Sequence, residues 1–78
     1  MALLRNLHAT SAERNSLHVE TDGGWRTFVV DGRRLLQIDT YGSDERIRAG
    51  HVSQSIQLDE ARAKQVLDII RQSFPSIE

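Results

Sequence analysis

The chain has no cysteine, so it can form neither a disulfide nor a thiolate metal site. It has one tryptophan, one tyrosine and two phenylalanines among 78 residues, which provides little aromatic mass for a large core. No run approaches the roughly eighteen apolar residues of a membrane span, and the opening residues 1–5 are too short for the apolar region of a signal peptide. These absences predict a soluble, cytoplasmic protein that does not contact membranes.

The chain also lacks an excess of positive charge, with ten basic and eleven acidic residues and a net charge of −1. The composition therefore excludes the strongly basic domain that by itself indicates nucleic-acid binding. All basic residues except Lys64 are arginines, which are better than lysines at binding phosphates and at stacking. A GC-rich genome would explain the same bias. A chain this short forms one domain and gains much stability from dimerising.

The N-terminal part of the chain changes period at residue 16. Residues 1–15 hold three leucines at helical spacing, and they are predicted to form a helical turn followed by a loop. From residue 16 the apolar residues Leu17 and Val19 alternate with polar ones, which predicts a first strand. Asp22-Gly23-Gly24 is then predicted to be a turn.

Three more strands are predicted from the same alternation. Residues 25–30 are rich in β-formers, and Asp31-Gly32 is a strong hairpin signal before a third strand at residues 35–41. After a charged, glycine-containing loop, residues 52–58 alternate again and form a fourth strand. No interval is long enough for a parallel crossover, so the four strands are predicted to form an antiparallel meander.

The last element is an amphipathic helix. Asp59 is a suitable N-cap, and Pro75 ends the helix. Its apolar stripe consists of Ala63, Val66, Leu67, Ile70 and Phe74. Ile69 widens that stripe beyond what one small sheet covers, which predicts a homodimer that uses this helix. The fold class is therefore α+β, a dimeric ββββα domain at residues 16–78 that follows the segment 1–15.

The stretch LLQIDTYGSDERIRAGHVSQSIQLDEARAKQVLDII carries a family resemblance. It resembles the single-stranded-DNA-binding domain of the transcriptional coactivators called positive cofactor four. The resemblance lies in the order of the strands, the charged glycine-containing loop, the acidic cap and the final helix. The resemblance covers residues 16–74 and implies a dimer whose helices pack together and whose curved sheets bind single strands. The same stretch also resembles a group of short bacterial proteins of unassigned role, which implies a bacterial origin.

Carried over residue by residue, the resemblance proposes a nucleic-acid surface on the sheet. Alternation along the third and fourth strands turns Gln37, Asp39 and Tyr41 away from the helix, beside Ser53 and Gln57. Cations would neutralise phosphates, aromatic rings would stack on bases, and amides and hydroxyls would donate hydrogen bonds. The proposed residues are Trp25, Arg26, Arg33, Arg34, Gln37, Tyr41, Arg46, Arg48, Ser53 and Gln57.

This surface has competing interpretations. Antiparallel sheets usually have one solvated face, and a packed core position is the competing interpretation for Trp25. Over residues 26–50, four acids lie among five arginines, whereas the resembled family is rich in lysines there. The alternative function is a dimeric protein-interaction module that acts as an accessory or regulatory subunit.

Catalysis is not expected. His8, His18 and His51 are scattered, no pair of histidines has the spacing of a metal site, and no G-x-S-x-G nucleophile motif occurs. The sequence therefore predicts a protein that is not an enzyme and has neither cofactor nor metal. The leading prediction is binding of nucleic acid, preferentially single-stranded DNA, in transcription regulation or DNA maintenance.

Overall fold

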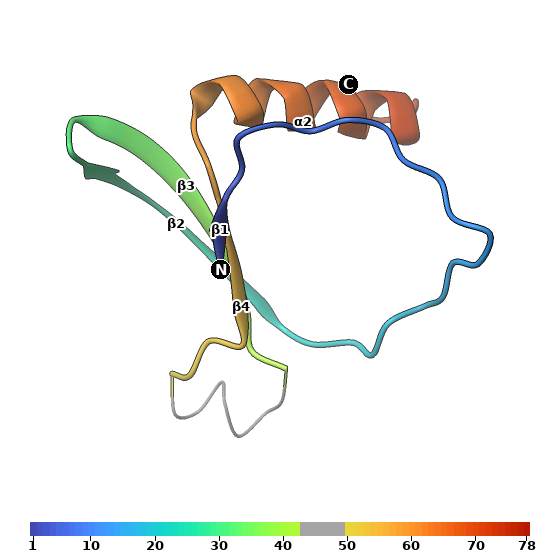
Figure 1. The fold of residues 1–78 in the computed structure, drawn as a ribbon, viewed down its shortest axis with the longest axis horizontal. Helices are drawn as coiled ribbons and strands as arrows, with labels where there is room; N and C mark the ends of the chain where they lie inside the picture. Colours follow the sequence, from blue (N-terminus) through green and yellow to red (C-terminus); the bar gives the residue numbers. More distant parts are fainter. Residues whose placement is uncertain (43–49) are drawn as a thin grey trace.

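The described residues form a small mixed sheet with a helix at its end (Figure 1). The computed structural model describes residues 1–42 and 50–78. Its elements in chain order are β1 (Ala2–Leu3), β2 (Gly23–Val30), β3 (Arg33–Thr40), β4 (Gln54–Leu58) and α2 (Glu60–Ser73). The predicted α+β class is confirmed.

The hairpin of β2 and β3 follows from its two turn residues. Asp31 and Gly32 both have positive φ, 52° and 74°, as a two-residue turn that matches the twist of the flanking strands requires. The strands pair antiparallel from Val30 opposite Arg33 to Gly23 opposite Thr40. The predicted hairpin is confirmed.

Gly23 and Gly24 do not form the predicted turn, because they are the first residues of β2. A Cβ added at Gly24 would lie 2.9 Å from the hydroxyl of Tyr41, so glycine lets that ring lie across the strand. The two glycines therefore serve a close approach within the sheet rather than a change of chain direction.

The sheet is mixed, and the prediction of a purely antiparallel one is wrong. Its strand order is β1-β4-β3-β2, and β2, β3 and β4 form the predicted antiparallel meander. Against the outer edge of β4, however, β1 pairs in parallel, with Ala2 opposite Ile56 and Leu3 opposite Gln57. The backbone N–H of Leu4 extends this ladder by donating to the carbonyl of Gln57 at 3.0 Å. Pairing with a free strand edge is favoured over an isolated helical turn, whose nucleation is unfavourable.

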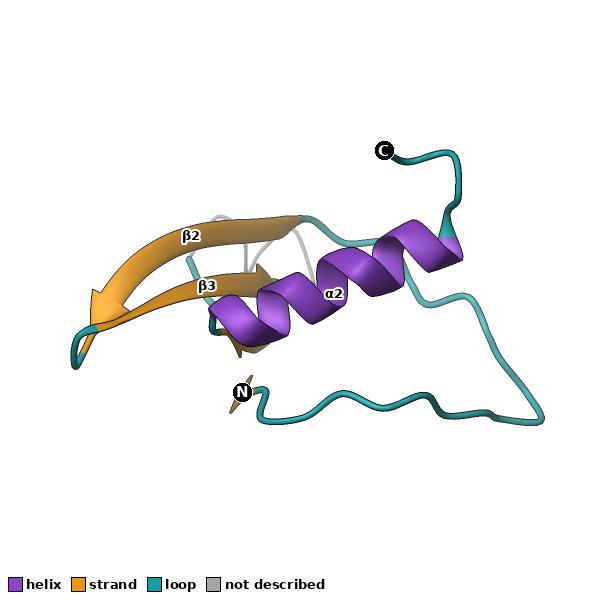
Figure 2. Ribbon diagram, turned by 90° about the horizontal axis from the view of Figure 1, so that it is seen from above, coloured by secondary structure: helices purple, strands orange, loops and turns teal. Residues whose placement is uncertain are grey.

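The predicted first strand at residues 16–20 is also wrong. Residues 8–20, the arm, are exposed throughout and pair with no strand of the described chain. The side chains of Leu17 and Val19 are 98% and 89% exposed. The arm leaves the sheet alongside α2 and returns to β2 as a wide open loop (Figures 1 and 2).

The helix is confirmed with its predicted boundaries. A carboxylate oxygen of Asp59 accepts from the backbone N–H of Arg62 at 2.9 Å, which satisfies one free donor of the first turn. At the other end, Phe74 is the C-cap, its N–H donates to the carbonyl of Ile70, and Pro75 follows.

Very little of the chain is buried. Leu35 and Leu58 are the only large apolar side chains of the core in the described residues, at 6% and 5% exposure. Leu58 lies under the start of α2, where it lines a hollow with Leu36 and Ala63. Leu35 is on the opposite face of the sheet, where its cross-strand neighbour is Phe28. In α2 no residue is fully buried.

Candidate functional site

The strand register divides the sheet into an apolar face and a polar face. Trp25, Ile38 and Ile56 are neighbours in one row across β2, β3 and β4. Because side chains alternate along each strand, these three residues share one face of the sheet. This is the face that α2 partly covers, and we call it the apolar face. In the next row Arg26 lies opposite Gln37 and Gln37 opposite Gln57, and these side chains belong to the polar face.

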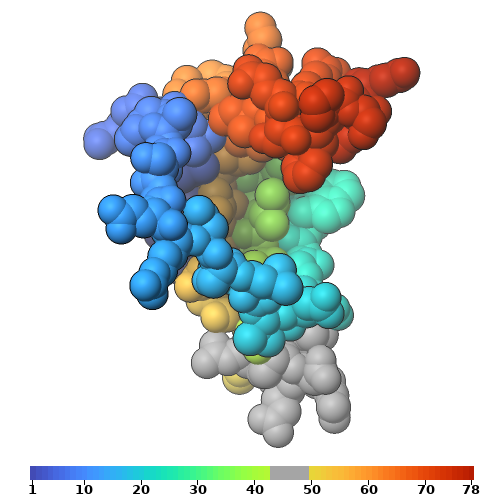
Figure 3. All heavy atoms as spheres, turned by 90° about the vertical axis from the view of Figure 1, so that its right-hand side faces the viewer, coloured from blue at the N-terminus to red at the C-terminus, as the bar shows by residue number. Residues whose placement is uncertain are grey.

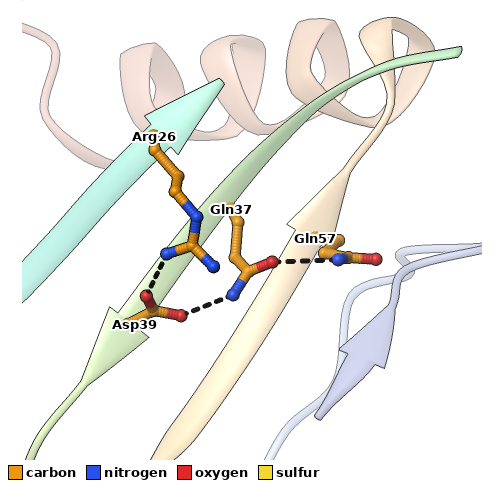
Figure 4. A network of polar contacts seen from close by, with 4 residues as sticks. All are labelled: Arg26, Gln37, Asp39 and Gln57. Atoms are coloured by element: carbon orange, nitrogen blue, oxygen red, sulfur yellow. Dashed lines mark hydrogen bonds and ion pairs between the residues drawn. The ribbon is translucent and has the colours of Figure 1, made fainter. Parts of the chain in front are cut away.

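A chain of hydrogen bonds crosses the polar face (Figure 4). Arg26 donates from Nη1 to Oδ2 of Asp39 at 2.6 Å, and Gln37 donates from Nε2 to Oδ1 at 2.8 Å. Gln57 in turn donates from Nε2 to the side-chain oxygen of Gln37 at 2.9 Å. The guanidinium of Arg26 also lies 5.7 Å from the ring centroid of Phe28, within cation–π range. Three strands are therefore linked by one polar network.

Asp39 is the centre of this network and is only 2% exposed, whereas the side chain of Arg26 is 57% exposed. The interpretation of Asp39 as part of a wet face is therefore wrong. The hydrogen bond from Gln37 lowers the pKa of Asp39 most, Arg26 lowers it further, and desolvation opposes both. The resulting carboxylate neutralises Arg26, the arginine that lies opposite Gln37 on the polar face.

The other predicted site residues do not share one surface. Arg33 donates to Oδ2 of Asp59 at 3.2 Å, at the start of α2. Arg34 shares its face with Leu36, and so belongs with Trp25 on the apolar face. Tyr41 follows β3, beside Gly24, and Ser53 precedes β4 with its N–H bonded to the carbonyl of Thr40 at 2.7 Å. Arg46 and Arg48 lie outside the described residues.

A second basic cluster lies where the N-terminal strand meets the start of α2. Arg5, Arg33 and Arg62 line a hollow of about 490 Å³ together with Leu3, Leu4 and Asp59. Asp59 is the one acid in this lining, and both of its oxygens accept hydrogen bonds, from Arg62 N–H and from Arg33. The backbone N–H of Arg62 lowers the pKa of Asp59 most, and the nearby arginines add to that shift against desolvation. Sequence reasoning missed this cluster because its arginines come from three distant segments.

The apolar face is the second prominent surface of the described chain. Trp25 is 74% exposed, and its row neighbours Ile38 and Ile56 are 44% and 45% exposed. The expectation of a packed tryptophan therefore fails within the single chain. On α2 the exposed residues Leu67, Ile70 and Phe74 continue the apolar surface at 43%, 37% and 60%. The sequence did signal such a surface, through Ile69 and the broad apolar stripe of the helix.

Within residues 1–42 and 50–78, no three His, Asp or Glu side chains are close enough together to bind a metal ion. In the same residues no helix has the length and apolar character to cross a membrane. No family model, curated protein or solved structure matches the chain.

Proposed function

We propose that this chain is a protein-interaction module that works as a homodimer, with the apolar face and α2 in the interface. The observation that carries the proposal is the accessible surface of the chain, 7041 Å². A compact monomer of 8.8 kDa exposes about 4,800 Å², so this chain exposes about 2,300 Å² more. Its radius of gyration, 14.6 Å, likewise exceeds the value of about 11.5 Å for a compact domain of this length.

The size of this excess fits a permanent dimer. If each chain buries about 2,300 Å², the interface totals about 4,600 Å², which is within the range of roughly 2,000–5,000 Å² for obligate dimers. The exposed apolar row of the sheet and the exposed stripe of α2 provide the hydrophobic area that such an interface needs. Full burial of each large apolar side chain contributes about 1.5–3 kcal/mol.

The charges along α2 favour a second copy of the chain as the partner. Glu60, Lys64, Asp68 and Arg71 follow one side of the helix next to the apolar stripe and alternate in sign. If the α2 helices of two chains pair antiparallel about a two-fold axis near Val66, the order of these charges along the partner's helix is reversed. Each acid then faces a base, as an isologous interface requires.

Matched substitutions on α2 test this proposal. Leu67→Asp places a charge in the exposed apolar stripe, whereas Gln72→Asp introduces the same charge on the other side of the helix. We expect Leu67→Asp to give a species of single-chain mass in light scattering, while Gln72→Asp keeps the dimer mass. Circular dichroism of both variants reports whether α2 is retained. A folded dimer of Leu67→Asp would contradict the proposed interface.

Binding of single-stranded nucleic acid, in transcription regulation or DNA maintenance, is the second candidate function. The observation that favours it is the hollow with Arg5, Arg33 and Arg62, which contains three cations and one carboxylate. Titrating a labelled single strand at two salt concentrations would give a log–log slope of about −0.7 per phosphate contacted. Replacing Arg33 and Arg62 by alanine should reduce that slope, and a strand that stays free at low salt rejects this candidate.

A further inference from the structure

We infer that the arm, residues 8–20, clasps the second chain of the homodimer, with Leu17 and Val19 packed against the partner's α2. The inference rests on the proposed homodimer and adds a second contact to it. Each arm residue is exposed, and the two apolar side chains are almost fully so. They alternate with His18 and Glu20, the pattern of a segment with one apolar edge and one polar edge.

Both ends of the arm are attached to the folded part of the chain. At one end the Gln65 side chain on α2 donates to the carbonyl of Leu7 at 2.8 Å. At the other end the N–H of Gly42 donates to the hydroxyl of Thr21 at 3.0 Å. Figure 3 shows the arm in front of the sheet, with strands visible between the arm and α2. The arm, α2 and the apolar face therefore enclose an opening on three sides.

The arm does not pair with β2 in the described chain, and the bond between Thr21 and Gly42 holds residue 21 in line with that strand. Thr21 lies opposite Gly42, which extends the line of β2 and β3 beyond their paired residues. Gly23 and Gly24 are extended within β2, so only residues 21 and 22 remain to reverse the chain. A hairpin between residues 16–20 and β2 would have to turn at residues 21 and 22, where Thr21 is instead bonded to Gly42 in the line of β2.

A second copy of the chain is the occupant that the charge order along α2 favours. In the antiparallel α2 pairing, the partner's helix lies against the apolar face of this chain, on the side where the arm projects. Its exposed residues Leu67, Ile70 and Phe74 then meet the apolar edge of the arm. By two-fold symmetry each chain gives one arm and receives one, so the interface closes without unpaired ends.

Two matched double variants test the inference. Leu17→Ser with Val19→Ser removes the apolar edge of the arm, and His18→Ser with Glu20→Ser changes the polar edge of the same segment. All four side chains are exposed in the single chain, so neither variant should alter its fold. We expect the first variant to raise the dimer dissociation constant at least about tenfold, and the second to change it less than about threefold. Sedimentation equilibrium over a concentration series measures both constants.

The outcomes separate the two proposals. If the Leu17 and Val19 variant dimerises as tightly as the control, the inferred clasp is wrong while the homodimer stands. If both variants weaken the dimer to the same extent, the apolar contact is also refuted, because the polar edge of the arm would then matter as much as the apolar edge. If the unaltered chain is a monomer, the homodimer and the clasp fail together.

The absence of cysteine allows an independent check. Chains with Leu17→Cys are mixed with chains with Ile70→Cys and oxidised, so that a disulfide between the two variants forms only where the two sites approach within about 7 Å. The clasp predicts that this mixed disulfide is the main product. A mixture with Arg14→Cys in place of Leu17→Cys is the control. Equal yields from both mixtures would overturn the inference.

Discussion

Replacing the exposed tryptophan tests how much of the interface lies on the sheet. Trp25 is 74% exposed in the single chain, which leaves about 150 Å² of its side chain uncovered. At about 25 cal/mol per Å², burying that area in a dimer contributes up to about 3–4 kcal/mol per chain. Since a two-fold interface contains two copies, and every 1.4 kcal/mol is a tenfold change, we expect Trp25→Ala to raise the dissociation constant at least about a hundredfold.

The assay for this variant is thermal unfolding followed by circular dichroism at several protein concentrations. For a dimer the melting temperature rises with concentration, because association stabilises the folded state. We expect Trp25→Ala to lower the melting temperature most where the unaltered chain is dimeric. The control is Val30→Ala, which removes a 48% exposed apolar residue of the same strand on the polar face. Equal melting curves for Trp25→Ala and the unaltered chain at high concentration would refute the placement of Trp25 in the interface.

Three further predictions concern the single chain. Asp39 has a lowered pKa when folded, so the stability it contributes is present above its ordinary pKa of 3.8 and is lost as the pH falls through the lowered value. Melting temperatures from neutral to acidic pH should therefore fall less steeply for Asp39→Asn, and parallel curves would contradict the network. Asp59→Ala removes the N-cap of α2 and should lower the melting temperature by about 4–8 °C, whereas Gln72→Ala, on the side of the helix away from the proposed interface, should have little effect. Leu58→Ala opens a cavity in the small core and should cost about 2–5 kcal/mol in urea unfolding, and a cost below 1 kcal/mol would show that the site is not packed.

The elements that the sequence predicted correctly are those encoded by neighbouring residues. Asp31-Gly32 supports positive φ at both turn positions, and Asp59 caps a helix whose apolar residues recur at helical spacing. Each signal lies within a few positions of the structure it determines. The β2–β3 hairpin and α2 were therefore predicted within about two residues.

The errors arose where structure depends on a distant partner. Leu17 and Val19 have the alternation of a half-buried strand, yet no strand of residues 1–42 and 50–78 lies beside them. Ala2 and Leu3 became a strand only because the edge of β4, more than fifty residues away in sequence, was free to pair. An alternating pattern predicts which side chains need burial, but it does not identify the surface that buries them.

The candidate site was predicted by residue type and only partly by position. Gln37 and Gln57 do lie together, as the alternation of their strands implied. The pairing of Arg26 with Asp39 depends on the register between β2 and β3, which residue types alone do not reveal. The arginines around the hollow come from β1, β3 and α2 and their flanks, so only the folded chain brings them together.

Sedimentation equilibrium of the unaltered chain tests the central claim most directly. The proposed interface predicts a particle of twice the 8.8 kDa chain mass over about 1 to 100 µM, with dissociation only at the lowest concentrations. A stable, folded particle of single-chain mass throughout that range would contradict it, because about 2,300 Å² of excess surface would then remain in water.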